Sequence, residues 1–131
     1  MEALILEGST DTPGVNFDKN SDELIIKGSS MPEDVKEFYS PIMNWIDAYF
    51  ESPNDITKFV FEMVYFNTAS SKMILDIMYK LKDGIDNGNN VEVTWKYYED
   101  DEEMMEAGED FAEIVEMPIE LVSIYHTSKE K

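Results

Sequence analysis

The residues that could do chemistry in this chain are mostly carboxylates, because the sequence holds one histidine and no cysteine. The histidine, His126, lies in the polar stretch His126-Thr127-Ser128-Lys129, where we expect an exposed side chain because chain ends are typically frayed. Without a second histidine or a thiol, the common nucleophile–base pairs of enzymes cannot be assembled. We therefore predict no catalytic residues and no cysteine-based metal site.

Carboxylates alone can act as acid and base only where their surroundings shift their pKa values. The densest group, eight acids from Glu99 to Asp110, is typical of a solvated run at a helix start, where acids suit the dipole. The stretch Asp18 to Asp22 begins like a calcium loop, but Glu23 and Ser29 stand where an EF-hand needs glycine and glutamate. We predict a hairpin turn there, with no metal or cofactor site, and keep a small carboxylate-dependent enzyme only as an alternative.

A hydroxyl-rich segment, Asn67-Thr68-Ala69-Ser70-Ser71-Lys72, follows the strongly apolar run that ends at Phe66. It joins an expected strand to an expected helix. Asparagine, serine and threonine all cap helix N-termini well, so capping accounts for this segment on composition alone. Capping needs only one such residue, however, and the segment offers four.

Charge narrows the classes of partner. Ten basic and twenty-nine acidic residues give a formal net charge of −19, which repels nucleic acids and anionic membranes and favours basic protein partners. The first ten residues lack the basic and apolar regions of a signal peptide, and no apolar run approaches the ~18 residues of a membrane span. We expect a cytoplasmic protein without membrane insertion.

Hydrophobic periodicity predicts the elements that must position these residues. The expected strands cover Val15 to Asp18, Glu23 to Lys27, Thr57 to Phe66, Val91 to Tyr97 and Ile119 to Tyr125, with Ala3 to Leu6 as a candidate edge strand. The expected helices begin at Pro32-Glu33-Asp34, after Phe66, and at Asp100. Gly84 together with the run Asp86 to Asn90 should stop the second helix, and the third should end at Glu116. Pro41 falls inside the first helix, where we expect a kink or break.

The central strand from Thr57 to Phe66 carries apolar residues on both faces, so we expect it to be covered on both sides, with Phe61 in the core. We expect Trp95 in the core as well. The order β-β-α-β-α-β-α-β with short connections predicts an α/β fold, a mixed β-sheet with helices packed on it. At this length we expect one domain over residues 1–131.

Motifs over most of the chain, from about Thr12 to Glu120, resemble the SiaC family of bacterial regulatory phosphoproteins. The matching segments are Thr12-Pro13-Gly14-Val15, Gly28-Ser29-Ser30-Met31-Pro32-Glu33, Phe38 to Trp45, Tyr65 to Lys72, Val93-Thr94-Trp95-Lys96-Tyr97 and Glu106 to Phe111. Several motifs in the same order make this resemblance more specific than any one of them.

The resemblance implies a STAS-like fold, like that of anti-sigma-factor antagonists, and a non-enzymatic partner-switching adaptor. Thr68 matches the family's phosphoacceptor, whose state is set by a cognate Ser/Thr kinase and a PPM-type phosphatase. The unphosphorylated form would bind and activate a diguanylate cyclase, raising cyclic di-GMP in biofilm signalling. Asn67, Ser70, Ser71 and Lys72 would shape the switch turn, and the helix from Ala69 to Leu81 would dock the partner. An unmodified anti-sigma-antagonist-like binding module is the alternative.

Overall fold

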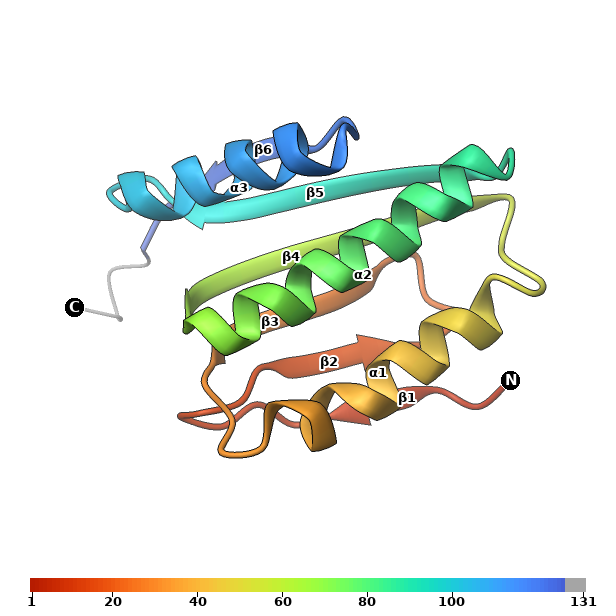
Figure 1. Ribbon diagram of the computed structural model, residues 1–131, viewed down its shortest axis with the longest axis horizontal. Coiled ribbons are helices and arrows are strands. Elements are labelled where there is room, and N and C mark those ends of the chain that lie inside the picture. The colour runs from red at the N-terminus through yellow and green to blue at the C-terminus, as the bar shows by residue number, and fades with distance from the viewer. Residues whose placement is uncertain (127–131) are drawn as a thin grey trace.

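The computed structural model describes residues 1–126, which form a six-stranded sheet and three helices (Figure 1). The strands are β1 (Leu4–Leu6), β2 (Gly14–Phe17), β3 (Leu24–Ser30), β4 (Ile56–Phe66), β5 (Asn90–Tyr98) and β6 (Glu120–Ile124). The helices are α1 (Val35–Tyr49), α2 (Thr68–Asp86) and α3 (Glu102–Val115). Within residues 1–126, no helix is long and apolar enough to cross a bilayer.

The strands lie in the sheet in the same order as in the chain, from β1 to β6. The first three pair antiparallel, and β3 to β6 pair parallel, which confirms the predicted mixed α/β sheet. The observed order has one strand more than predicted, because the candidate edge strand β1 pairs with β2, with Leu4 opposite Phe17. Three residues give too little alternation for a sequence pattern to establish a strand.

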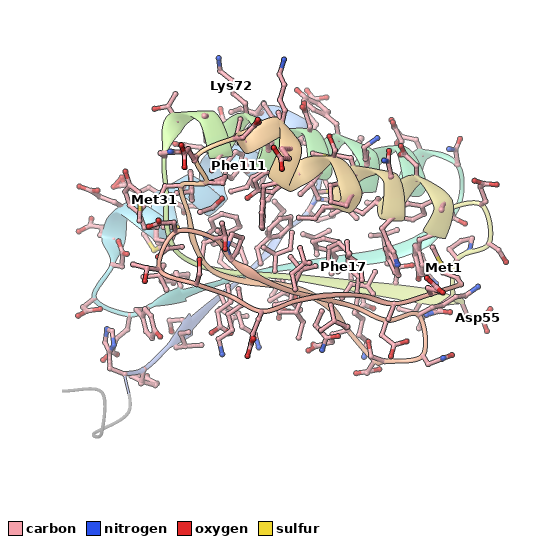
Figure 2. The ribbon with its side chains drawn as sticks, turned by 90° about the horizontal axis from the view of Figure 1, so that it is seen from below. Met1, Phe17, Met31, Asp55, Lys72 and Phe111 are labelled. Atoms are coloured by element: carbon pink, nitrogen blue, oxygen red, sulfur yellow. The ribbon has the colours of Figure 1, made fainter. Side chains whose placement is uncertain are left out.

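All three helices lie on one face of the sheet, as Figure 2 shows. The prediction that β4 is covered on both sides is therefore wrong, although β4 is central, between β3 and β5. From β3 onward, each β–α–β connection places the new strand on the same side of the preceding strand. Because such crossovers are right-handed, they place every helix on the same side.

The core lies between that helical layer and the sheet. Phe61 and Trp95 are both 0% exposed, which confirms them as core residues. Their ring centroids are 5.6 Å apart, and Trp95 also packs on Phe111 of α3 at 5.5 Å. The indole N–H of Trp95 donates to the Met104 carbonyl at 2.9 Å, so its polar atom is satisfied inside the core.

The break expected at Pro41 does not occur, whereas the predicted end of α2 is confirmed. Helix α1 begins one residue after its N-cap Asp34 and runs through Pro41 without a break. Both Pro41 and Glu37, whose carbonyl loses its helical donor, are exposed, so water can replace that bond. Helix α2 ends at Asp86, inside the predicted stop from Gly84 to Asn90. Gly84 itself lies within the helix, where an added Cβ would lie 2.7 Å from Cε1 of Phe50.

Candidate functional site

The turn between β4 and α2 is clamped by Asn67, the N-cap of α2. Its side-chain Oδ1 accepts a hydrogen bond from the Ser70 N–H at 2.9 Å, as expected for an N-cap. Its backbone N–H donates to the carbonyl of Ser30 at 3.1 Å, which ties the turn to the end of β3. Asn67 therefore fixes where the next residue, Thr68, leaves the sheet.

The three hydroxyl side chains of the turn have different surroundings. Thr68, the first residue of α2, is exposed. Ser70 is 0% exposed. Ser71 is partly exposed, and its Oγ donates to the Thr68 carbonyl at 2.8 Å, a bond within the first helical turn. Of the three residues, Thr68 is the one whose side chain is classed as exposed.

Beneath the turn lies a buried chain of hydroxyl groups. Ser30 Oγ donates to Ser70 Oγ at 2.8 Å and lies 2.6 Å from the Tyr39 hydroxyl. Because the single Ser30 proton goes to Ser70, the Tyr39 hydroxyl must donate to Ser30. The chain therefore links α1, β3 and α2 through three side chains that are each 0% exposed.

Burial raises the pKa of the Tyr39 phenol above its ordinary value of 10.0, and the hydrogen bonds with Ser30 and Ser70 oppose that rise. The phenol is thus neutral and able to donate at neutral pH. Sequence reasoning missed this chain, because Tyr39 fits the apolar stripe of α1 and Ser30 lies at a strand end. Only the tertiary structure brings Ser30 and Ser70, forty positions apart, into contact.

The N-terminus of α2 carries no acidic side chain, unlike the N-termini of α1 and α3. Helix α1 begins with Asp34 and Glu37, and α3 begins with Asp101 followed by two glutamates. Helix α2 has a neutral cap and no acid in its first turn. Lys72 lies four positions after Thr68, and Figure 2 shows its side chain pointing outward from the helical layer. The exposed hydroxyl thus stands where helix geometry and a lysine both favour negative charge.

A groove of about 550 Å³ runs between α1 and α2, where its lining on α2 begins at Met73. Tyr39, at 0% exposure, lies beneath the floor of this groove, where its hydroxyl belongs to the buried hydroxyl chain. Met43, Met73 and Tyr79 supply apolar surface, and Tyr79 is 43% exposed. Flexible methionines and an exposed tyrosine are typical of surfaces that adapt to a protein partner.

The other chemistry-bearing residues are not brought into this site. The ring of His126 is exposed, stacks on Tyr98 with centroids 4.0 Å apart, and lies 3.3 Å from Asp100 Oδ1. Asp18 Oδ1 accepts from the Asn20 N–H at 2.9 Å within the β2–β3 turn, which confirms the predicted hairpin. Over residues 1–126, no group of three or more histidines and carboxylates could hold a metal ion.

Comparison with known proteins gives consistent results for family and fold. The family model for the SiaC family regulatory phosphoprotein matches residues 6–124. A relative in Pseudomonas aeruginosa, described as an uncharacterized protein, is 26% identical over 118 residues, covering 90% of this chain and 94% of the relative.

Solved structures show the same fold. The structure of SiaC of Pseudomonas aeruginosa has a TM-score of 0.82 at 24% identity and covers 96% of this chain and 100% of its own. A chain in the crystal structure of the diguanylate cyclase SiaD in complex with its activator SiaC, from the same organism, has a TM-score of 0.85 at 25% identity. That match covers 94% of this chain and 99% of the other.

Proposed function

The chain belongs to the SiaC family of regulatory phosphoproteins, and we propose that it is a non-enzymatic, cytoplasmic partner-switching adaptor whose phosphoacceptor is Thr68. In this proposal residues 1–131 act as one regulatory domain. The unphosphorylated form binds and activates a diguanylate cyclase. A Ser/Thr kinase and a PPM-type phosphatase set the fraction that can bind.

The observation that carries the proposal is the exposure of Thr68 at the start of α2, the helix that also forms one wall of a groove suited to a protein partner. A kinase must reach the hydroxyl, and Ser70 is excluded by its burial and by its bond to Ser30. The complex between a similar protein and the cyclase SiaD supports a cyclase as the partner.

The fold should tolerate the phosphate. At the start of α2 the phosphate meets free backbone N–H groups and the positive end of the helix dipole, and Lys72 lies one turn away. The segment from Ala69 to Leu81 and the α1–α2 groove form the docking surface in this proposal. A partner that covers this surface would have to bury about −1.5 to −2 added charges with their hydration.

The energy needed for a switch is modest. The chain contains no arginine, so it cannot form a bidentate guanidinium–phosphate pair that would shield the group inside an interface. A loss of ~3 kcal/mol in binding free energy lowers affinity by about a hundredfold. Such a loss is enough to dissociate most of the complex with the partner while the concentrations of both proteins stay constant.

The test compares purified unmodified and phosphorylated protein for binding to a diguanylate cyclase from the same genome, by calorimetry and by cyclic di-GMP production. Intact mass, with an added ~80 Da, establishes the modified form. We expect at least a hundredfold weaker binding and loss of activation, with an unchanged melting temperature. The Thr68→Ala variant should bind like the unmodified protein and resist the kinase, and Ser71→Ala is the matched control that should remain a substrate. Equal binding by both forms would show that the switch is wrongly assigned. No binding by either form would exclude the cyclase as the partner, and protein from native cells without the added ~80 Da would favour the unmodified binding module.

A further inference from the structure

The face of the sheet opposite the helices is not covered by any element among residues 1–126 (Figure 2). On β3, β4 and β5 the side chains alternate, with Ile26, Phe61 and Trp95 turned into the core at 0% exposure. Their neighbours along each strand therefore point to the open face. Two of the largest exposed apolar side chains of the protein lie there, Ile5 at 60% and Ile56 at 47%.

The charged side chains on this open face alternate in sign. In the register of the sheet, Lys27 lies opposite Glu62, and Glu62 lies opposite Lys96. Lys58 lies opposite Glu92, so a second lysine–glutamate pair crosses from β4 to β5. The Lys27 Nζ is 3.4 Å from Glu62 Oε2, which confirms that the two side chains share this face.

The strands of the open face carry no net charge, although the protein is strongly acidic. Its charged residues on the six strands are Lys27, Lys58, Lys96, Glu62, Glu92 and Glu120. The three lysines and three glutamates cancel, and Asp22 of the β2–β3 turn, whose Oδ2 lies 3.7 Å from Lys58 Nζ, adds one negative charge at the edge of the face. Nearly all of the formal charge of −19 therefore comes from the rest of the chain. Between these charges lie aliphatic side chains, among them Ile25, Val122 and Ile124, each partly buried.

We propose that the open sheet face is a self-association surface that takes a second copy of this chain, face to face. A strongly basic partner would be attracted to the acidic helical side, and a strongly acidic one would be repelled by the protein as a whole. Lysines and glutamates are equal in number on the strands of this face, so the lysines of one copy can pair with the glutamates of a second copy. A two-fold interface needs such a patch, because the same surface serves both copies.

The size of the face is sufficient. Six strands spaced ~4.8 Å apart span about 24 Å, and a strand of about eight residues spans about 27 Å. The resulting area of about 650 Å² approaches the ~800 Å² per partner of a standard interface. The net charge of −19 on each copy gives the interaction a recognisable salt dependence. Salt screens the repulsion between two acidic copies, so dimerisation should strengthen as salt is added.

The test is analytical ultracentrifugation of the full chain from about 5 to 500 µM, at 50 and 300 mM NaCl. We expect a reversible monomer–dimer equilibrium whose dissociation constant falls at least threefold at the higher salt. Ile5→Glu on the open face should weaken the dimer at least tenfold. Ile114→Glu is its matched control, because Ile114 is 54% exposed on α3. Lys96→Glu should weaken the dimer similarly, whereas Lys72→Glu, with the same charge change on the helical side, should have less than a threefold effect.

Circular dichroism melts establish that each variant is folded before its association is measured. A monomer at every concentration and salt would overturn the proposal. A dimer that weakens equally in the paired variants, or that dissociates as salt is added, would equally overturn it. None of these measurements involves the cyclase or phosphorylation, so their outcome is independent of the switch at Thr68.

Discussion

Replacing Ser70 by alanine should destabilise the protein much more than replacing Thr68, although the two hydroxyls are two residues apart. Ser70→Ala removes the acceptor of the Ser30 proton in a site where both side chains are 0% exposed. If Ser30 turns toward Tyr39 instead, the phenol proton loses its acceptor, so one buried donor is left unpaired in either arrangement. An unpaired buried donor costs about 1–3 kcal/mol.

That cost converts into a measurable change in melting temperature. Unfolding entropy of about 2.1 cal/mol/K per residue gives about 0.28 kcal/mol/K for the whole chain, so the expected decrease is about 4–11 °C. Thr68→Ala should change the free energy of unfolding by no more than ~0.5 kcal/mol, because its side chain is exposed. Circular dichroism melts of the two variants and the wild type, at equal concentration, make the comparison.

The same variants distinguish structural from regulatory hydroxyls when they are offered to the kinase. Ser70→Ala should still gain ~80 Da at 20 °C, below its melting transition, and Thr68→Ala should not. The reasoning would be refuted if Ser70→Ala melted within 1–2 °C of the wild type by this estimate. A phosphate found on Ser70 in the folded protein would refute it as well.

Three further results are expected. Phe61→Ala should lower the free energy of unfolding by about 3–5 kcal/mol in urea titrations, because it empties the centre of the core; a loss below ~1 kcal/mol would contradict that placement. Gly108→Ala should cost about 1–3 kcal/mol by overpacking, since a Cβ there would lie 2.5 Å from Cδ1 of Trp95; a neutral result in the same assay would show that the indole can move. The pKa of Tyr39 is raised in the folded protein, so the unfolded chain ionises first as the pH rises. The stabilising contribution of the neutral phenol is therefore complete below pH 10 and is lost as the pH rises through the folded pKa. The stability advantage of the wild type over Tyr39→Phe should shrink from pH 9 to 11 in melts, and an advantage that grows would contradict the assignment.

Local patterns predicted most elements, because each depends on residues close together in the chain. The alternation of Val93 and Trp95 identified β5, and Asp101, three residues before the buried Met104, marks the start of α3. The α3 prediction began at Asp100, one residue before its N-cap, which is within the usual uncertainty of helix ends. Pro41 misled the prediction, because packing of α1 on the sheet outweighs the local preference of proline.

Strand composition could not predict whether helices cover one face of the sheet or both. Val60 faces away from the helices and is 2% exposed, so it looks like a residue covered by a second layer. It is buried by its neighbours on the open face instead, with Ile25 and Thr94 opposite it in the register. The candidate turn, in contrast, was placed correctly at a strand-to-helix junction. Its hydroxyl partners were not foreseen, because Ser30 and Tyr39 come from other elements.

The uniform direction in which strands β3 to β6 are added also bears on what kind of ligand this fold can receive. In open α/β sheets, nucleotides and other small molecules enter where the strand order reverses, because helices leave to opposite faces there and open a crevice. Strands β3 to β6 have no such reversal. The carboxyl ends of β3, β4 and β5 are instead followed by the starts of α1, α2 and α3, and the exposed Thr68 lies at the middle one of these three helix starts.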